Sequence, residues 1–206
     1  GEQPNDDQII ASNTYGLAAM LKAAGATPRL LPIARDRLTS LEQVFSLIGT
    51  ADAVITVGGA SVGDYDFVSQ AASNFGMKQS FYKVAMRPGK PLMAGYLRGI
   101  PMIGLPGNPV SAMVCGEVFL IPLIQKMLGL PAVPRLRKIG PIGHSLPQNG
   151  AREHYMRAKL INGSIFIEDS QDSSLLTVLA NADALAVRPK DDGPLKEGSN
   201  IEYIPL

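Results

Sequence analysis

Residues 52–75 read DAVITVGGASVGDYDFVSQAASNF, which predicts a buried strand, a glycine turn and a helix in direct succession. The stretch Asp52–Val57 is β-branched at nearly every apolar position, as expected of a strand covered on both faces. Gly58 and Gly59 end it, and helical spacing follows over Asp66–Phe75. A strand that passes through a glycine turn into a helix is typical of α/β folds.

The same alternation continues on both sides of this stretch. Upstream, helical spacing follows Ser12-Asn13 and stops at Gly25, and Thr39 with Glu42 predicts a capping box at the start of a second helix. We expect further strands over 28–33, 81–85, 91–95 and 100–105, and a long helix from 108 to about 128. Short connections between alternating strands and helices predict an α/β, three-layer sandwich with a mostly parallel sheet.

The pattern changes near residue 133. Beyond it the sequence shows strand signals with almost no helix, over 153–161, 164–168, 184–187 and 200–204. Asn162-Gly163 between the first two runs is a strong hairpin signal. The Pro131/Pro134 pair marks a linker. We therefore expect an α/β domain over residues 1–133 and a small all-β, barrel-like domain over residues 134–206.

Composition narrows the classes of function. There are 19 Lys and Arg against 18 Asp and Glu, so the formal net charge of +1 gives no broad basic field for nucleic acid. Cys115 cannot form an internal disulfide, and with only His144 and His154 beside it no Cys/His zinc site can be assembled. We interpret Cys115 as a core residue and the two histidines as surface or structural residues. The longest apolar run is interrupted by charges and the chain opens without a signal peptide, so we expect a cytoplasmic protein with no membrane partner.

Three loops carry candidate chemistry. The Gly58-Gly59 loop and the loop over 105–112 both leave the carboxyl end of a strand, so one sheet edge should hold both. Glycine allows close approach to an anion, and amides at a helix start would point at it, although an ordinary turn explains a lone glycine pair equally well. Neither loop has the GxGxxG pattern or a P-loop lysine. A third loop places Lys83, Arg87 and Lys90 within eight residues, for which we favour anion binding over a solvated turn.

Carboxylates follow the predicted strands. Asp36, Asp64 and Asp66 could hold Mg²⁺ against phosphate oxygens, or could only cap turns and a helix.

The segments GGASVGDYD (58–66), KVAMRPGKP (83–91) and GLPGNPVSA (104–112), in that order, resemble the signatures of the molybdopterin molybdotransferase family, which includes bacterial MoeA proteins and the gephyrin E domain. The resemblance implies Mg²⁺-dependent insertion of molybdate into adenylylated molybdopterin with release of AMP. It implies catalytic roles for Asp36, Asp66, Lys83 and Arg87, with the two carboxylates holding the metal ion. The substrate-binding residues that it implies are Ser12, Asn13, Gly58, Gly59, Ser61, Gly63, Lys90, Pro106, Gly107, Asn108, Pro109 and Ser111.

The resemblance also implies a homodimer and partners among the enzymes that make molybdopterin. It implies a strand before the first helix that this chain lacks, so the sheet should have a gap. Arg87 stands where some relatives carry lysine, which keeps the charge but changes the donor geometry. Two alternatives stay open: a related molybdopterin adenylyltransferase, whose relatives carry a GGTG-like loop, and a non-catalytic, peptide-binding scaffold of the gephyrin type.

Overall fold

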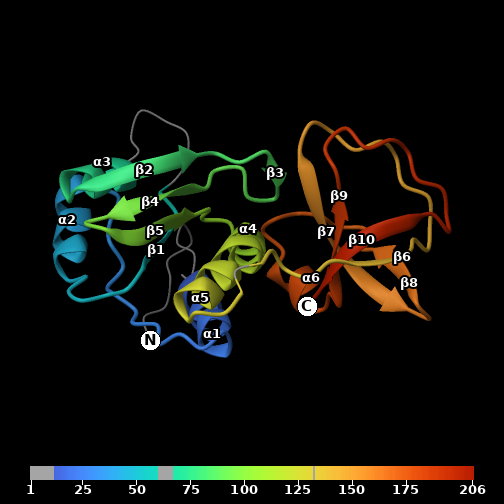
Figure 1. The fold of residues 1–206 in the computed structure, drawn as a ribbon. Helices are drawn as coiled ribbons and strands as arrows, with labels where there is room; N and C mark the ends of the chain where they lie inside the picture. Colours follow the sequence, from blue (N-terminus) through green and yellow to red (C-terminus); the bar gives the residue numbers. More distant parts are fainter. Residues whose placement is uncertain (1–11, 60–66, 132) are drawn as a thin grey trace.

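The computed structural model describes residues 12–59, 67–131 and 133–206 of the chain. These residues form two sheets that lie side by side along the molecule, with helices around the first (Figure 1). The first sheet has the order β1-β5-β4-β2 and is built from β1 (Val54–Val57), β2 (Met77–Tyr82), β4 (Met93–Leu97) and β5 (Ile100–Leu105). The predicted strands over 52–57 and 100–105 are thus confirmed.

This sheet is mixed, which corrects the expectation of a mostly parallel one. β1 pairs in parallel with β5, but β4 pairs antiparallel with both β5 and β2. The physical reason lies in the connection between β4 and β5, which is only Arg98-Gly99, with φ of 51° and 89°. A two-residue turn of this kind closes a hairpin, whereas a parallel crossover needs a dozen or more residues.

Helices cover both faces of the first sheet, as predicted for a three-layer sandwich (Figure 1). Their bounds are α1 (Asn13–Ala23), α2 (Leu38–Ser46), α3 (Phe67–Asn74), α4 (Pro109–Cys115) and α5 (Ile121–Met127). Phe45 of α2 and Val68 of α3 share one buried cluster with Met102 of β5. The next residue, Ile103, belongs to the other cluster with Leu17 of α1, because successive side chains of a strand point to opposite faces.

The helix predicted from Asn108 to about 128 is confirmed, with a π-helical segment η1 (Gly116–Leu120) joining α4 to α5. By length and composition the run Pro109–Met127 could cross a membrane, but half of it is buried inside the protein. Val110, Val114 and Leu120 lie in the main core cluster. We therefore interpret the run as a core helix.

Two local predictions near the amino end are wrong. The segment 28–33 forms no strand. The capping box of Thr39 and Glu42 is absent, because α2 begins at Leu38 and Glu42 accepts a hydrogen bond from Asn74 of α3 instead. At the start of α2 a tertiary partner outweighs the local signal.

The second sheet forms the expected barrel-like domain. It has the order β3-β7-β9-β10-β6, and β8 also pairs with β7. Its strands are β3 (Met86–Arg87), β6 (Lys138–Pro141), β7 (Glu153–Ile161), β8 (Ser164–Ile167), β9 (Ala184–Arg188) and β10 (Asn200–Pro205). A bridge between Ile142 and Ile165 links the end of β6 to β8 and closes the ring. One short helix, α6 (Leu176–Ala180), was not predicted. Asn162 and Gly163 have positive φ, which confirms the predicted hairpin turn.

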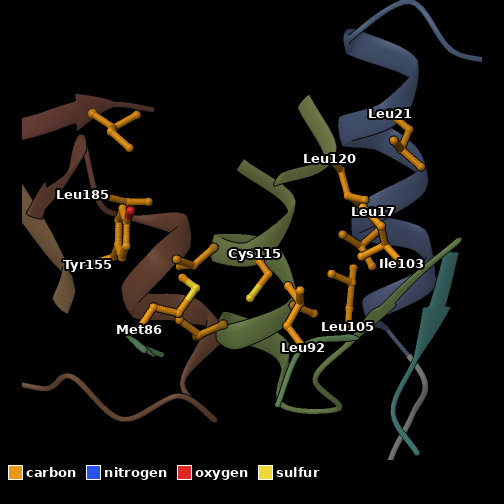
Figure 2. Packing of buried hydrophobic residues seen from close by; sticks show 14 of the residues in the cluster. Leu17, Leu21, Met86, Leu92, Ile103, Leu105, Cys115, Leu120, Tyr155 and Leu185 are labelled. Atoms are coloured by element: carbon orange, nitrogen blue, oxygen red, sulfur yellow. The ribbon is translucent and has the colours of Figure 1, made fainter. Parts of the chain in front are cut away.

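The two parts share one apolar core. Figure 2 shows Cys115 of α4 between Tyr155 and Leu185 of the barrel and the leucines of the first sheet and α1. Burial raises the pKa of the Cys115 thiol to about 12, so this side chain behaves as a small apolar residue, as expected from the sequence. The division at residue 133 stays a prediction.

Candidate functional site

The two glycine loops meet at one edge of the first sheet, as the sequence predicts. The Gly58 N–H donates to the Leu105 carbonyl at 3.0 Å, which holds the ends of β1 and β5 together. A Cβ placed on Gly107 would lie 3.5 Å from the Cα of Gly58. Gly59 has a φ of +71°, and a Cβ there would overlap Val68 of α3. Gly58 and Gly107 are therefore in ordinary contact, whereas Gly59 is required by its positive φ and by its packing against the Val68 side chain.

Two asparagines that the sequence places at helix starts tie this edge to distant segments. Asn13 Nδ2 donates to the Gly107 carbonyl at 2.6 Å, and Ser12 before it makes no side-chain cap. Asn108 makes no side-chain cap either; its Nδ2 donates to Ser173 Oγ at 2.8 Å, and the Val110 N–H donates to the Ser173 carbonyl at 3.1 Å. The barrel domain thus contributes a segment at the start of α4.

An open cavity of about 1820 Å³ runs along β1 and reaches this edge. Its lining includes seven of the predicted site residues, namely Asn13, Asp36, Gly58, Gly59, Gly107, Asn108 and Pro109, together with Ser174 of the barrel domain. Much of the remaining lining is apolar and comes from α1, α2 and β1. Pro106 and Ser111 are buried beneath the loop and outside this lining.

Only some of the residues predicted to bind Mg²⁺ and substrate are among the described residues. Ser61, Gly63 and Asp66 lie outside the described residues. Within the described residues no group of three or more His, Cys, Asp or Glu side chains gathers at one place. Mg²⁺ is commonly held by one or two carboxylates, with phosphate and water completing its shell. Asp36, an exposed carboxylate in the cavity wall, fits that role.

The cationic loop leaves the same sheet edge, since β2 and β5 both run antiparallel to β4. Lys83, Arg87 and Lys90 are exposed, and none of them lines the cavity. Gly89, with a φ of +111°, packs so closely on Cys115 of α4 that a Cβ would overlap the sulfur. Arg87 lies on β3, in register with His154 of β7. The loop therefore presents Arg87 at the junction with the barrel.

Arg157 of β7 is the functional candidate that the sequence reasoning missed. It is 0% exposed, and its Nη2 donates to the carbonyls of Asp172 at 3.1 Å and Ser170 at 3.5 Å. Its Nε and Nη1 are buried and have no hydrogen-bond partner among the described residues. Burial lowers the pKa of Arg157, and the nearby charge of Arg87 lowers it further. A buried guanidinium with two unpaired nitrogens is costly by itself and suited to a bound oxyanion.

The signal for Arg157 was present in the predicted strand 153–161. Side chains of a strand alternate between faces, so Arg157 shares a face with Tyr155, which packs in the core. A charge on a core-facing position requires a partner. No comparable signal marked Ser173, which only tertiary contact brings to α4.

His154 adds to the basic character of the junction. It is 7% exposed, and its Nε2 has no partner within the described part of the chain. Burial, followed by the charges of Arg87, Arg157, Arg152 and Arg188, lowers the pKa of His154 to about 4. The imidazole is therefore neutral at pH 7, and the positive charge there comes from arginines.

Comparison with known proteins agrees with this geometry. Residues 1–126 match the family described as "Probable molybdopterin binding domain", and residues 140–206 match "MoeA C-terminal region (domain IV)". The chain is similar to the molybdopterin molybdenumtransferase of Nostoc sp. (37% identity) and to molybdopterin molybdenumtransferase 2 of Mycobacterium tuberculosis (32% identity). The two alignments cover 97% and 95% of this chain, but only 48% and 50% of the relatives. It thus spans about half the length of the curated relatives it matches.

Solved structures show the same fold. Two structures of the molybdopterin biosynthesis MoeA protein of Pyrococcus horikoshii match the whole chain with TM-scores of 0.84 and 0.80, at 24% and 16% identity, over 50% and 51% of their own length. The family match covers more than half of the chain, and two of the three segments that carry the resemblance, at Gly58-Gly59 and at Gly107, line one cavity. The chain therefore belongs to the molybdopterin-binding domain family, and a MoeA-type C-terminal region follows that domain.

Proposed function

We propose that the protein acts in molybdenum cofactor biosynthesis as a molybdopterin molybdotransferase, inserting molybdate into adenylylated molybdopterin and releasing AMP. Family membership and the names of the relatives support this proposal. The observation that carries it is Arg157, a fully buried guanidinium whose Nε and Nη1 are unpaired within the described residues and whose Nη2 donates to the carbonyl of Asp172, two residues before the cavity-lining Ser174. Molybdate is a tetrahedral oxyanion, and a forked donor pair suits two of its oxygens.

Different residues of the chain would bind the phosphates, the molybdate and the metal ion. Backbone amides at the Gly58 and Gly107 loops would hold the substrate's phosphates, and Arg157 with Arg87 would hold molybdate at the barrel junction. Lys83 and Lys90 would add positive potential where negative charge develops. Asp36, together with Asp66, would hold Mg²⁺, which supplies Lewis-acid stabilisation of the phosphate oxygens. We also propose a cytoplasmic homodimer that receives its substrate from molybdopterin-producing enzymes.

A molybdate-dependent assay tests the function. The protein is incubated with adenylylated molybdopterin, Mg²⁺ and increasing molybdate, and AMP and active cofactor are measured together. We expect both products to rise with molybdate, and Asp36→Asn to weaken the Mg²⁺ dependence. AMP release that does not change with the molybdate concentration would favour a related adenylyl-processing enzyme. Absence of turnover together with tight capture of a peptide would favour the scaffold alternative.

A further inference from the structure

We propose that Gln171 is a positioning residue that holds Arg157 in the conformation that receives the oxyanion; this role rests on the proposed function. Gln171 lies in the segment that follows β8, half-buried against β7. It does not line the cavity. Its effect on an anion would therefore pass through Arg157.

The carboxamide of Gln171 clamps the backbone of Arg157 from both sides. Its Oε1 accepts from the Arg157 N–H at 3.0 Å, and its Nε2 donates to the Arg157 carbonyl at 3.0 Å and to the Glu168 carbonyl at 2.8 Å. β8 ends at Ile167, which pairs with Ala158, so Arg157 lies just beyond the β7–β8 ladder. The Glu168 N–H also donates to the Arg157 carbonyl at 2.9 Å, and Gln171 adds the partner that β8 does not provide for the Arg157 N–H.

The same clamp fixes the carbonyls that orient the guanidinium. Ser170 and Asp172, the residues on either side of Gln171, provide the oxygens that accept from Arg157 Nη2. The Asp172 carboxylate is engaged by the N–H and Oγ of Ser174, both at 2.9 Å. Backbone carbonyls therefore hold one nitrogen of the guanidinium, while Nε and Nη1 stay unpaired.

The segment also reaches the substrate loop. Ser173 accepts from the Val110 N–H at the start of α4, and its hydroxyl accepts from Asn108. Gln171 therefore anchors, on β7, a segment that contacts the proposed oxyanion site on one side and the cavity edge on the other. Loss of the anchor should loosen Arg157 without removing any group that touches the substrate.

The test compares Gln171→Met with Gln148→Met, an exposed glutamine of the same domain that serves as the matched control. Methionine keeps the length of the side chain and removes the three clamp bonds. The first readout is solvent exchange of the Arg157 Nε–H by NMR, with the Nε–H of Arg188, paired to Asp192, as the internal reference. The second is titration with sodium molybdate. We expect the Arg157 Nε–H to exchange faster and the Arg188 Nε–H to exchange at the same rate. We also expect the Kd for molybdate to rise roughly tenfold, which is the lower end of the effect of losing a residue that orients a ligand-binding side chain.

The two readouts separate the two claims. Faster exchange at Arg157 in a protein whose wild type binds no molybdate would uphold the positioning role and overturn the proposed function. Unchanged exchange and unchanged molybdate affinity in Gln171→Met, with a wild type that binds molybdate, would overturn the positioning role and leave the function intact. Equal acceleration at Arg157 and Arg188 would indicate general loosening and would also overturn it.

Discussion

At the scale of single residues, the charge of Arg87 is tested by substitution. Arg87→Ala should weaken molybdate binding by about 1–2 kcal/mol, or about 5- to 30-fold, because a charge-assisted contact at the barrel junction is lost. Lys196→Ala, an exposed lysine of the barrel, is the control and should have little effect. Calorimetric titration at two salt concentrations measures both, and the Arg87 effect should shrink at high salt. Equal losses in the two variants would contradict the assignment.

His154 makes the stability depend on pH. Its pKa is about 4 in the folded protein, mainly through burial, against an ordinary value of 6.5. Between these values the unfolded chain binds more protons, so the His154 contribution to stability is complete above pH 6.5 and is lost as the pH falls toward 4. The slope from one such proton is at most about 1.4 kcal/mol per pH unit.

Urea unfolding of the wild type and of His154→Gln between pH 7 and 4 checks this expectation. The free energy of unfolding should fall less steeply with decreasing pH in the variant, because glutamine does not titrate. Identical slopes would show that His154 keeps its ordinary pKa.

The residues that could be predicted from the sequence are those whose signal is local. Gly58 and Gly107 follow recognisable strands, and their loops meet because β1 and β5 are parallel. Asn13 and Asn108 were placed at helix starts, but their side chains bind Gly107 and Ser173, which only the fold brings near. Arg157 carried a usable signal, a charge on the core face of a strand, that was not used.

At the scale of elements, the turn of the cationic loop is fixed by Gly89. Gly89→Ala should destabilise the protein by about 1–3 kcal/mol, because its φ is +111° and a methyl group would overlap Cys115. Gly193→Ala is the matched control, since a Cβ there meets nothing within 4 Å. Thermal unfolding should show a loss of roughly 2–4 °C per kcal/mol in the first variant only. Similar melting temperatures for both would mean that the loop does not depend on this contact.

Helices and strands could be predicted where the hydrophobic pattern repeats over many residues. The helix from Asn108 and the strands β7, β8, β9 and β10 follow their predicted ranges closely. By contrast, β6 was not predicted, and β3, a strand of two residues, carries no periodicity at all. Its pairing with β7 is what brings Arg87 to the junction. The mixed direction of the first sheet was missed because the two-residue turn at Arg98-Gly99 was not recognised as a hairpin.

At the scale of the whole molecule, β1 is an edge strand within the described residues, and much of the cavity beside it is apolar. A further strand paired with β1 would provide backbone partners for that edge and cover apolar side chains exposed in the cavity wall, such as Leu30 and Ile33. We predict that a form of the protein lengthened at its amino end melts several degrees higher. Thermal unfolding of both forms at several protein concentrations tests this. Equal, concentration-independent melting temperatures would show that the edge needs no partner.

The central claim is that the molecule binds molybdate where the barrel meets the α/β part, at Arg157. Diffraction from molybdate-soaked crystals, recorded on both sides of the molybdenum absorption edge, locates the metal directly. We predict an anomalous peak within hydrogen-bonding reach of Arg157 Nε and Nη1, and no peak there in crystals of Arg157→Met. Molybdenum found only at surface lysines, or none near Arg157 at a saturating molybdate concentration, would contradict the account.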